Sequence, residues 1–357
     1  MNIFDDEHDG KEMRYLNRAE VIEACAAIDV VAVVREALKS HEQGETVLPA
    51  EAYLGWQTSN GFGARSLAMQ GMLTGANRTA IGLKVINGSL ENVERGLPRS
   101  QGLTMVFDKE TARPLVLMEA AYISALRTAA VTAATAQALG GPGPQSLALI
   151  GCGTLAKAHI KVLESSLPTL TEIRLHDWNE ARAKSLAEAV AAAFGDRLEV
   201  VVAPDSETCV RGADLVVPVT TVTEGYIPYA WLKPGAVVAH VSLDDLLPEV
   251  AERAGLLLVD DWSLVSEDQH RVFGRLYRQG RLLSPSGERH PDADPVASAR
   301  RVDATIGAVI AGTHPGRTSS TDVVVSNPFG MAILDVAVAD EVHRAAVERG
   351  LGISLPV

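Results

Sequence analysis

A buried strand that runs directly into a glycine turn and a helix restricts the possible folds of this chain more than any other feature of its sequence. The segment matches the pattern G-x-G-x-x-A and reads Leu147-Ala148-Leu149-Ile150-Gly151-Cys152-Gly153-Thr154-Leu155-Ala156. In this pattern the first glycine permits the tight turn, the second lets the backbone approach a pyrophosphate, and the small sixth residue lets helix pack on strand. Free N–H groups at the start of the helix then bind phosphate. The segment therefore predicts a dinucleotide-binding fold, with the cofactor contacting Gly151, Gly153, Thr154 and Leu155.

An acidic residue at the expected spacing supports this interpretation. Asp177 ends the next strand-like run and lies 24 residues after Gly153. An acid at this place binds the ribose hydroxyls and repels the 2′-phosphate of NADP. The sequence therefore predicts NAD as the cofactor, although the nearby Arg182 leaves some use of NADP open. The alternative is a tight strand–helix turn that binds no ligand.

Strand-like and helix-like segments alternate after the glycine turn. The strand-like runs are short and apolar, and they cover residues 173–175, 198–202, 215–219, 237–241 and 256–259. This alternation is typical of a parallel sheet with helices on both faces. Cofactors lie at the carboxyl edge of such sheets, which is where we expect Thr220 and Thr221.

The two chain ends have a different character. Residues 17–43 predict one or two amphipathic helices, and 48–116 predict a sheet interrupted by turns. Residues 119–139 are rich in alanine and predict a long helix, whereas 318–326 is strand-like and 330–349 is again helical.

These patterns predict an α/β protein with two domains. A Rossmann-type doubly wound parallel sheet, residues 130–317, would be inserted into an α+β domain that binds substrate and forms the dimer, made from residues 1–129 and 318–357. The length of 357 residues agrees with two domains, since it exceeds the usual size of one hydrophobic core. A homodimer is expected because the sheet of the second domain is too small to close its own core.

Composition excludes several classes of protein. The net charge of −13 argues against nucleic-acid binding that is independent of base sequence, because such binding needs a basic surface. Cys25, Cys152 and Cys209 are far apart, so we expect neither a disulfide framework nor a metal site. The sequence lacks a secretory signal at its start, and no apolar run reaches the roughly 18 residues that span a bilayer. We expect a cytoplasmic protein without a membrane or nucleic-acid partner.

Four of the cations before the dinucleotide segment, Arg65, Lys84, Arg99 and Arg127, are expected where the first domain would face the cofactor. Arg65 could be an ordinary surface arginine. Arg99 could be a loop arginine that is paired with an acid on a neighbouring strand. Lys84 and Arg127 differ, because Lys84 interrupts an apolar strand and Arg127 is the only strong charge between residues 122 and 139. A charge in such surroundings normally has a partner, which is either internal or a bound ligand.

Several stretches, in the same order, resemble the ornithine cyclodeaminase/mu-crystallin family over almost the whole chain. They are Gly82-Leu83-Lys84-Val85, Gly96-Leu97-Pro98, Leu126-Arg127-Thr128-Ala129-Ala130, the glycine turn, Gly316-Arg317-Thr318-Ser319 and Gly330-Met331-Ala332-Ile333-Leu334-Asp335-Val336-Ala337. The resemblance implies NAD-linked oxidation of an amino acid to an imine. By position, the resemblance implies that Arg65 and Arg127 hold the substrate carboxylate and that Lys84 contacts the carboxylate end of the substrate. It also implies that the acid after the strand 237–241 takes part in the reaction; this acid is Asp245 or, alternatively, Asp244.

The sequence departs from the cyclodeaminases at that acid. Their pattern Asp-x-Pro-Gly-Lys-x-Glu is replaced by Ser242-Leu243-Asp244-Asp245-Leu246-Leu247-Pro248-Glu249, which puts the cyclising step in doubt. Other stretches, 96–103, 118–124 and 326–330, resemble the dehydrogenase branch of 2,3-diaminopropionate biosynthesis.

That branch implies a specific reaction. Its members oxidise N-(1-amino-1-carboxy-2-ethyl)glutamate with NAD, and hydrolysis then releases 2,3-diaminopropionate and 2-oxoglutarate as a siderophore or antibiotic precursor is made. Arg99 suits this substrate, because it has three carboxylates and a guanidinium binds a carboxylate at two points. The alternatives are an ornithine or lysine cyclodeaminase, an imine reductase or amino-acid dehydrogenase, and a non-catalytic NAD-binding protein similar to mu-crystallin.

Overall fold

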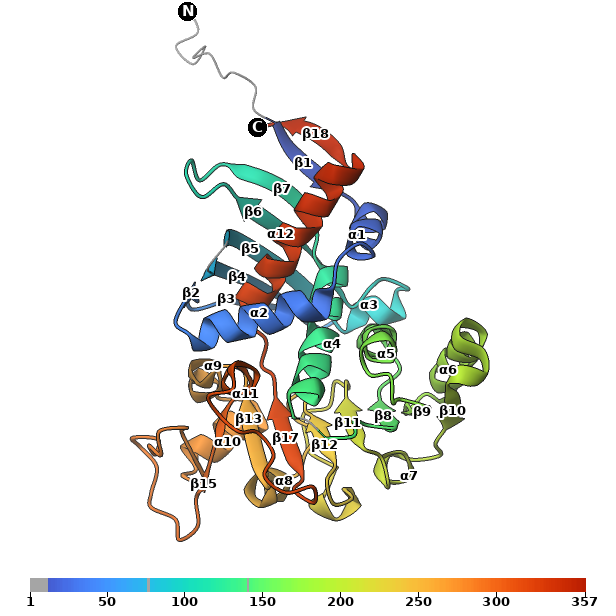
Figure 1. The fold of residues 1–357 in the computed structure, drawn as a ribbon, viewed down its shortest axis with the longest axis vertical. Coiled ribbons are helices and arrows are strands. Elements are labelled where there is room, and N and C mark those ends of the chain that lie inside the picture. The colour runs from blue at the N-terminus through green and yellow to red at the C-terminus, as the bar shows by residue number, and fades with distance from the viewer. Residues whose placement is uncertain (1–11, 76–77, 140) are drawn as a thin grey trace, which may run out of the picture. The chain divides into compact units, whose positions relative to one another are not determined.

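The computed structural model describes residues 12–75, 78–139 and 141–357, which form two compact units (Figure 1). Unit 1 comprises residues 1–127 and 331–357, and unit 2 comprises residues 128–330. The chain passes from unit 1 to unit 2 within helix α4 (Ala121–Ala138). An α/β fold with a Rossmann-type domain is thereby confirmed.

Unit 2 is built on an eight-stranded sheet in which all neighbouring strands are parallel. The strand order is β10-β9-β8-β11-β12-β17-β13-β16. The order reverses between β8 and β11, and ligands of doubly wound sheets bind beside such a reversal. The strands are β8 (Ser146–Ile150), β9 (Glu172–His176), β10 (Glu199–Val202), β11 (Leu215–Pro218), β12 (Val237–Ala239), β13 (Leu256–Val259), β16 (Ala304–Thr305) and β17 (Val324–Asn327).

The position of β17 corrects the expected domain boundary. We predicted a strand over 318–326 in the terminal domain, but the strand is shorter and pairs with β12 on one side and β13 on the other. Residues 318–330 therefore belong to the Rossmann unit, and the boundary lies after residue 330. Sequence patterns did not indicate this, because a buried parallel strand has the same apolar character in any sheet.

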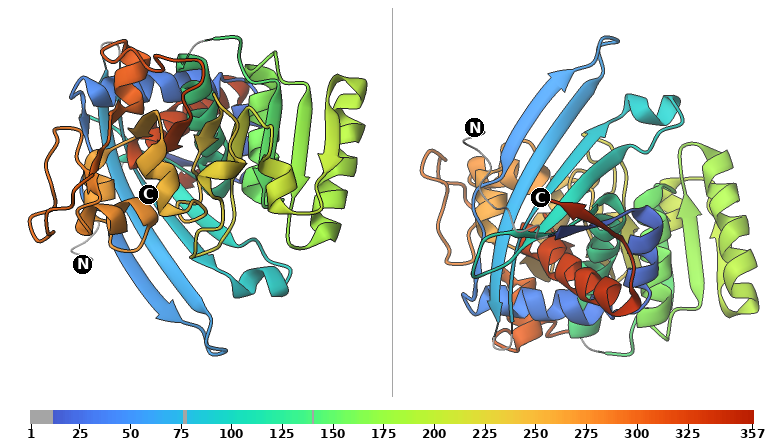
Figure 2. Two further views of the ribbon diagram at one scale, coloured as in Figure 1. Left: turned by 90° about the horizontal axis from the view of Figure 1, so that it is seen from below. Right: turned by 90° about the horizontal axis from the view of Figure 1, so that it is seen from above.

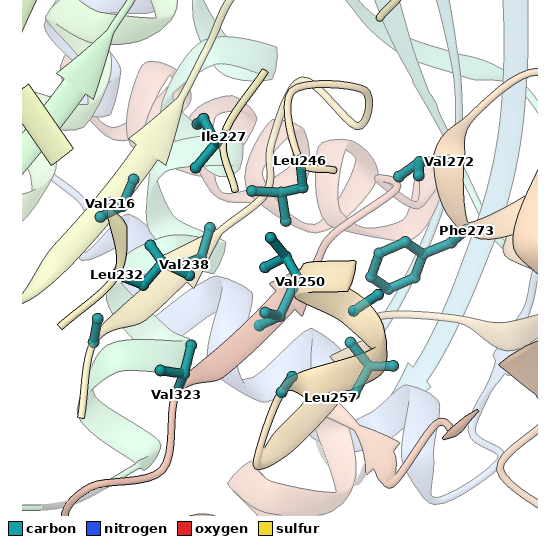
Figure 3. Packing of buried hydrophobic residues seen from close by; sticks show 14 of the residues in the cluster. Val216, Ile227, Leu232, Val238, Leu246, Val250, Leu257, Val272, Phe273 and Val323 are labelled. Atoms are coloured by element: carbon teal, nitrogen blue, oxygen red, sulfur yellow. The ribbon is translucent and has the colours of Figure 1, made fainter. Parts of the chain in front are cut away.

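A buried apolar core fills one face of the unit 2 sheet (Figure 3). Val216 and Val238 from the strands contribute to it, as do Val250 and Phe273 from the helices. The helical elements of unit 2 are α5 (Thr154–Ser166), α6 (Glu180–Phe194), η1 (Gly195–Arg197), α7 (Ser206–Val210), η2 (Tyr229–Trp231), α8 (Pro248–Arg253), α9 (Trp262–Glu267), α10 (Val272–Arg278) and α11 (Ile306–Ala311). A short pair, β14 (Leu282–Leu283) and β15 (Arg300–Arg301), lies outside the main sheet. Figure 2 shows β10 and α6 at one edge of the unit.

Unit 1 contains a second sheet, in which both chain ends meet. Its order is β18-β1-β7-β6-β5-β4-β2, and β3 also pairs with β4. All pairs are antiparallel except β1 with β7. The strands are β1 (Glu12–Leu16), β2 (Thr46–Val47), β3 (Ala52–Gln57), β4 (Gly63–Gly75), β5 (Arg78–Ser89), β6 (Ser100–Phe107), β7 (Pro114–Glu119) and β18 (Ile353–Pro356).

Helix α12 (Ala332–Arg349) packs on β4, β5 and β6 of this sheet and on α1 and α2 (Figure 1). The segment 17–43, expected as one helix or two, forms α1 (Arg18–Cys25) and α2 (Val30–Glu42). Asn17 ends the preceding strand and starts α1 with a capping box completed by Glu20. A short helix, α3 (Glu91–Glu94), joins β5 to β6.

Among the described residues, no helix combines the length and hydropathy required to cross a bilayer. Cys25, Cys152 and Cys209 are buried, and none of the three is part of a disulfide.

Candidate active site

The glycine turn has the geometry that a dinucleotide site requires. Gly151 has a φ of +95°, and a Cβ there would lie 2.9 Å from the Val219 carbonyl oxygen, so only glycine fits. Gly153 begins α5, and a Cβ there would meet no atom within 4 Å. No side chain caps this helix, and Thr154 in its first turn is exposed. The N–H groups of residues 153–155 are thus available to a phosphate.

Asp177 lies directly after β9 and is tied to the glycine turn. Its Oδ2 accepts a hydrogen bond from the Cys152 N–H at 2.8 Å, and its Oδ1 accepts one from the Asn179 N–H at 2.9 Å. The residue is 8% exposed. Each carboxylate oxygen has two lone pairs, so both can accept one more hydrogen bond from a ribose hydroxyl.

A cavity of ≈ 350 Å³ opens beside Asp177 at the carboxyl ends of β9 and β10. Its lining includes the acids Asp177 and Glu180 and the apolar residues Val202 and Ala203. Arg182, which left NADP open from sequence, does not line it. A cavity lined by two acids suits an adenosine with free ribose hydroxyls and disfavours a 2′-phosphate.

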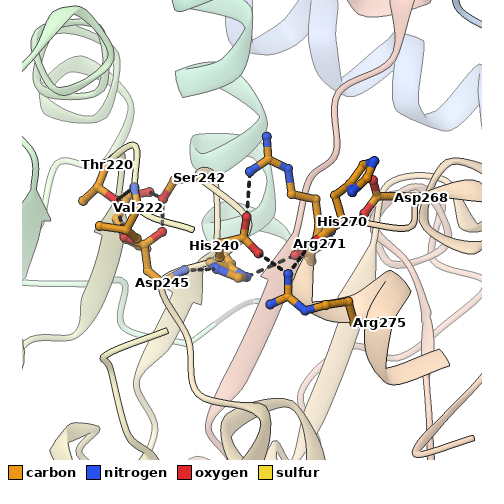
Figure 4. A network of polar contacts seen from close by, with 12 residues as sticks. Thr220, Val222, His240, Ser242, Asp245, Asp268, His270, Arg271 and Arg275 are labelled. Atoms are coloured by element: carbon orange, nitrogen blue, oxygen red, sulfur yellow. Dashed lines mark hydrogen bonds and ion pairs between the residues drawn. The ribbon is translucent and has the colours of Figure 1, made fainter. Parts of the chain in front are cut away.

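Asp245 lies in a network of hydroxyl groups in the loop that follows β12 (Figure 4). Its Oδ1 accepts from the Thr220 hydroxyl at 2.6 Å and from the Tyr226 hydroxyl at 3.0 Å, and its Oδ2 accepts from the Ser242 hydroxyl. Burial, followed by the nearby Asp245 carboxylate, raises the pKa of Tyr226 well above its usual range, so this phenol remains a donor. The predicted acid and the predicted cofactor residue Thr220 are therefore in direct contact.

His240 holds the backbone of this loop. Its Nε2 accepts from the Asp245 N–H at 3.1 Å, so the proton of the neutral ring is on Nδ1, which lies 3.1 Å from Asn327 Oδ1. Burial lowers the pKa of His240 to about 3, which keeps the ring neutral. The loop that carries Asp245 is thus hydrogen-bonded through His240 to the end of β17.

Asp244 is in a different environment from Asp245. It is 2% exposed and forms ion pairs with Arg271 at 2.7 Å and Arg275 at 3.2 Å. Both oxygens of this carboxylate are therefore engaged in ion pairs with guanidinium groups. The sequence analysis missed these two arginines, because no motif links them to the loop after β12.

Thr221, which was expected beside Thr220 at the carboxyl edge of the sheet, is exposed.

In unit 1, Lys84 and Arg127 are brought together by an acid that the sequence analysis did not select. Asp335 Oδ2 lies 2.7 Å from Lys84 Nζ and 3.2 Å from Arg127 Nε. A sequence signal existed, since Asp335 is the single charge in the apolar run 332–339. The sequence analysis expected each cation to have an internal partner or a bound ligand, and Asp335 is an internal partner of both.

Burial and charge act in opposite directions on Lys84. Desolvation lowers its pKa, and the adjacent Asp335 carboxylate is the strongest influence that raises it again. Arg127 lowers the pKa further, whereas Glu51 raises it more weakly. The two neighbouring cations hold the pKa of Asp335 below its usual value against the effect of burial. Asp335 therefore remains an anion between two cations.

Arg65 and Arg99 lie farther along the same sheet. Arg65 on β4 is paired with Gly88 on β5, and Gly88 is paired with Ser100, the residue after Arg99. Lys84 is four residues from Gly88 along β5, which corresponds to about 13 Å. Both arginines are exposed. Unit 1 thus carries a buried pair of cations, Lys84 and Arg127, and an exposed pair, Arg65 near the start of β4 and Arg99 directly before β6.

The chain is similar to known proteins over almost its whole length. The model of the ornithine cyclodeaminase/mu-crystallin family matches residues 11–350. N-((2S)-2-amino-2-carboxyethyl)-L-glutamate dehydrogenase of Staphylococcus aureus (strain NCTC 8325 / PS 47) is 27% identical over 356 residues, covering 97% of this chain and 98% of that protein.

Two solved structures are similar over nearly the whole chain. The crystal structure of CmnK has 39% sequence identity and a TM-score of 0.86, covering 97% of this chain and 98% of that chain. An archaeal alanine dehydrogenase dimer with bound NAD has 26% identity and a TM-score of 0.81, covering 97% and 99%. The two relatives whose names state an activity, the glutamate-conjugate dehydrogenase and the alanine dehydrogenase, are both dehydrogenases but differ in substrate.

Proposed function

The chain belongs to the ornithine cyclodeaminase/mu-crystallin family, and from this we propose that it is an NAD-dependent oxidoreductase acting on N-(1-amino-1-carboxy-2-ethyl)glutamate. The products would be 2,3-diaminopropionate and 2-oxoglutarate. The observation that carries the substrate assignment is the pair of exposed arginines, Arg65 and Arg99, in addition to the buried cations Lys84 and Arg127. A substrate with three carboxylates can use both groups of cations, whereas alanine and ornithine carry one carboxylate.

The cofactor would be held by the glycine turn and by Asp177. Gly151 and Gly153 leave the backbone open to the pyrophosphate, and Thr154 and Leu155 supply N–H groups at the start of α5. NAD, when bound, accepts the hydride from the substrate Cα. The acids at the cavity favour NAD over NADP for the reason given above.

The chain's own residues would orient the substrate and handle its protons. Lys84 and Arg127 bind one carboxylate, and Arg65 and Arg99 bind the others, so the carbon to be oxidised is held in one orientation. Loss of the hydride and of the N–H proton converts the C–N bond to C=N. Water then adds to that carbon, and cleavage of the C–N bond releases the keto acid and the amine.

Asp245 would accept the proton of the attacking water. Oδ1 of Asp245 already accepts two hydroxyl hydrogen bonds and Oδ2 accepts one. The proton would therefore reach Oδ2 directly, or pass through the hydroxyl of Thr220 or Ser242, each of which donates to Asp245 while its own oxygen can accept from water. Asp244 is less suited, since both of its oxygens are engaged in ion pairs with Arg271 and Arg275.

We propose in addition that the protein is a cytoplasmic homodimer that supplies a siderophore or antibiotic precursor. Support for self-association comes from β3, where Tyr53, Leu54 and Trp56 are 66%, 64% and 47% exposed. Apolar side chains grouped in this way on one strand are typical of a protein interface.

The test combines a substrate panel with one variant. Purified protein and NAD are supplied with the glutamate conjugate, ornithine, lysine or alanine, and NADH absorbance and released 2-oxoglutarate are followed. Arg99→Ala should lower kcat/KM for the conjugate about ten- to hundredfold, the value of a lost charge-assisted contact. Arg95→Ala is the matched control, because it removes an arginine from the same connection that is paired with Glu91 at 2.6 Å and is not among the proposed substrate contacts.

The outcomes separate the alternatives. Net NADH with release of 2-oxoglutarate from the conjugate supports the proposal. Proline formation from ornithine without net NADH, unaffected by Arg99→Ala, would identify a cyclodeaminase. NADH formed from alanine alone would identify a simple amino-acid dehydrogenase, and NAD binding with no turnover would identify a non-catalytic binder.

A further inference from the structure

We propose that Asp335 is a positioning residue that holds Lys84 and Arg127 together as one receptor for a single substrate carboxylate. The inference rests on the proposed function in one respect, namely that these two cations bind substrate. It adds a residue from the C-terminal part of unit 1, 251 positions from Lys84 in the sequence.

The first support is the way in which Asp335 is shared. One oxygen, Oδ2, contacts both cations, at 2.7 Å from Lys84 Nζ and 3.2 Å from Arg127 Nε. The other oxygen, Oδ1, is buried and has no hydrogen-bond partner in the described part of the chain. A salt bridge that served stability alone would be expected to use both oxygens, since unpaired buried polar atoms are costly.

The second support is the set of donors that Asp335 leaves unused. Asp335 approaches Arg127 from the Nε side at 3.2 Å, and this buried Nε has no hydrogen-bond partner in residues 12–75, 78–139 and 141–357. Lys84 donates to Asp335, and its second contact, to Ser124 Oγ, is long at 3.5 Å. Both cations are therefore anchored on one side and keep N–H groups for a ligand.

The third support is the charge of the cluster. Lys84, Arg127 and Asp335 together carry a net charge of +1, and their side chains are 2%, 10% and 0% exposed. An excess charge in such a place is unfavourable until an anion compensates it. One carboxylate would neutralise the cluster, and the 10% exposure of Arg127 shows where the cluster can be reached.

The fold determines the position of Asp335 through close packing of α12 on the sheet. Gly71 and Gly82 are paired across β4 and β5. A Cβ on Gly71 would lie 3.0 Å from Ile333, and one on Gly82 would lie 3.1 Å from Val336. The two glycines thus let α12 approach the strand that carries Lys84, and Asp335 lies between these two helix residues.

Asp335 also determines the charge state of Lys84. Burial and Arg127 lower the Lys84 pKa, Asp335 is the main opposing group, and Glu51 contributes less. Without the Asp335 charge, Lys84 would lose its proton at a lower pH. Carboxylate binding would then weaken at a lower pH than in the wild type.

The experiment compares three variants. Asp335→Asn keeps the size of the side chain and removes its charge, whereas Asp335→Glu keeps the charge and moves it by one methylene. Asp340→Asn is the matched control, because Asp340 is on the same helix and is also buried and paired with an arginine, Arg344, at 3.4 Å. For each variant, the melting temperature, NADH affinity and the pH dependence of KM are measured.

We expect Asp335→Asn to raise KM about ten- to hundredfold and to make KM begin to rise with pH at a lower pH than it does in the wild type. NADH affinity should not change, since the cofactor residues belong to unit 2. If Asp335→Asn does not fold, Asp335→Glu carries the test, with a raised KM and the wild-type pH profile. A folded Asp335→Asn with wild-type KM at every pH, or an Asp335→Glu with wild-type KM, would overturn the proposal.

The role of Asp335 can be tested with any substrate that the protein oxidises, so its failure can be distinguished from failure of the proposed substrate assignment. The assay employs whichever of the conjugate, alanine, ornithine and lysine the wild-type protein oxidises, and every one of them carries an α-carboxylate. Turnover of alanine without turnover of the conjugate would refute the proposed substrate. The dependence of the alanine KM on Asp335 would still test the positioning role.

Discussion

Replacing Asp177 by asparagine should weaken NAD binding without unfolding the protein. The change keeps the shape of the side chain but removes one charge and one acceptor oxygen. In the structure each carboxylate oxygen accepts one backbone N–H, from Cys152 and from Asn179. An asparagine can keep only one of these bonds and turns its NH₂ group toward the other N–H.

The magnitudes follow from these contacts. Loss of one hydrogen bond to a nearly buried carboxylate should cost about 1–3 kcal/mol of folding stability. Loss of a charge-assisted bond to the ribose should cost about 1.5–3 kcal/mol of binding, or roughly ten- to hundredfold in Kd for NADH. The affinity for NADPH should fall less, because the variant no longer repels the 2′-phosphate.

The assay is a fluorescence titration of NADH and NADPH, with a thermal melt in the absence of cofactor. Asp205→Asn is the matched control: Asp205 follows β10, caps α7 through the Thr208 N–H, and does not line the cavity. The control should lose little stability, because asparagine caps a helix about as well as aspartate, and it should keep its NADH affinity. A folded Asp177→Asn that binds NADH as tightly as the wild type would show that the ribose does not bind at the end of β9.

Two further predictions concern stability and assembly. Burial lowers the pKa of His159 to about 4 and that of His240 to about 3, whereas the unfolded chain has histidine pKa values of about 6.5. The unfolded state therefore binds more protons below neutral pH, and each histidine should reduce stability by about 2 kcal/mol between pH 7 and pH 5; thermal melts at the two pH values test this, and a higher melting temperature at pH 5 would contradict it. Light scattering at micromolar concentration should show a dimer or a multiple of dimers. Trp56→Asp on the exposed strand β3 should shift the protein toward monomer. A wild-type protein that is only monomeric would refute this prediction.

The features that could be predicted from sequence depend on short stretches of chain. The glycine turn and Asp177 were identified because a strand, a tight turn and a helix start are encoded within ten residues, and the acid follows at the end of the next strand. Lys84 and Arg127 were selected because each interrupts an apolar run, and burial of both is what such a pattern indicates.

Tertiary structure decided what these residues contact. The pairing of Lys84 and Arg127 through Asp335 depends on α12 packing on β4 and β5, and no local pattern encodes contact between positions 251 residues apart. The same holds for Arg271 and Arg275 at Asp244, and for β17, whose insertion between β12 and β13 moved the domain boundary to residue 330. Local sequence determines the conformation of a turn or helix, whereas the partner of a buried charge or of a strand depends on which distant segments pack together.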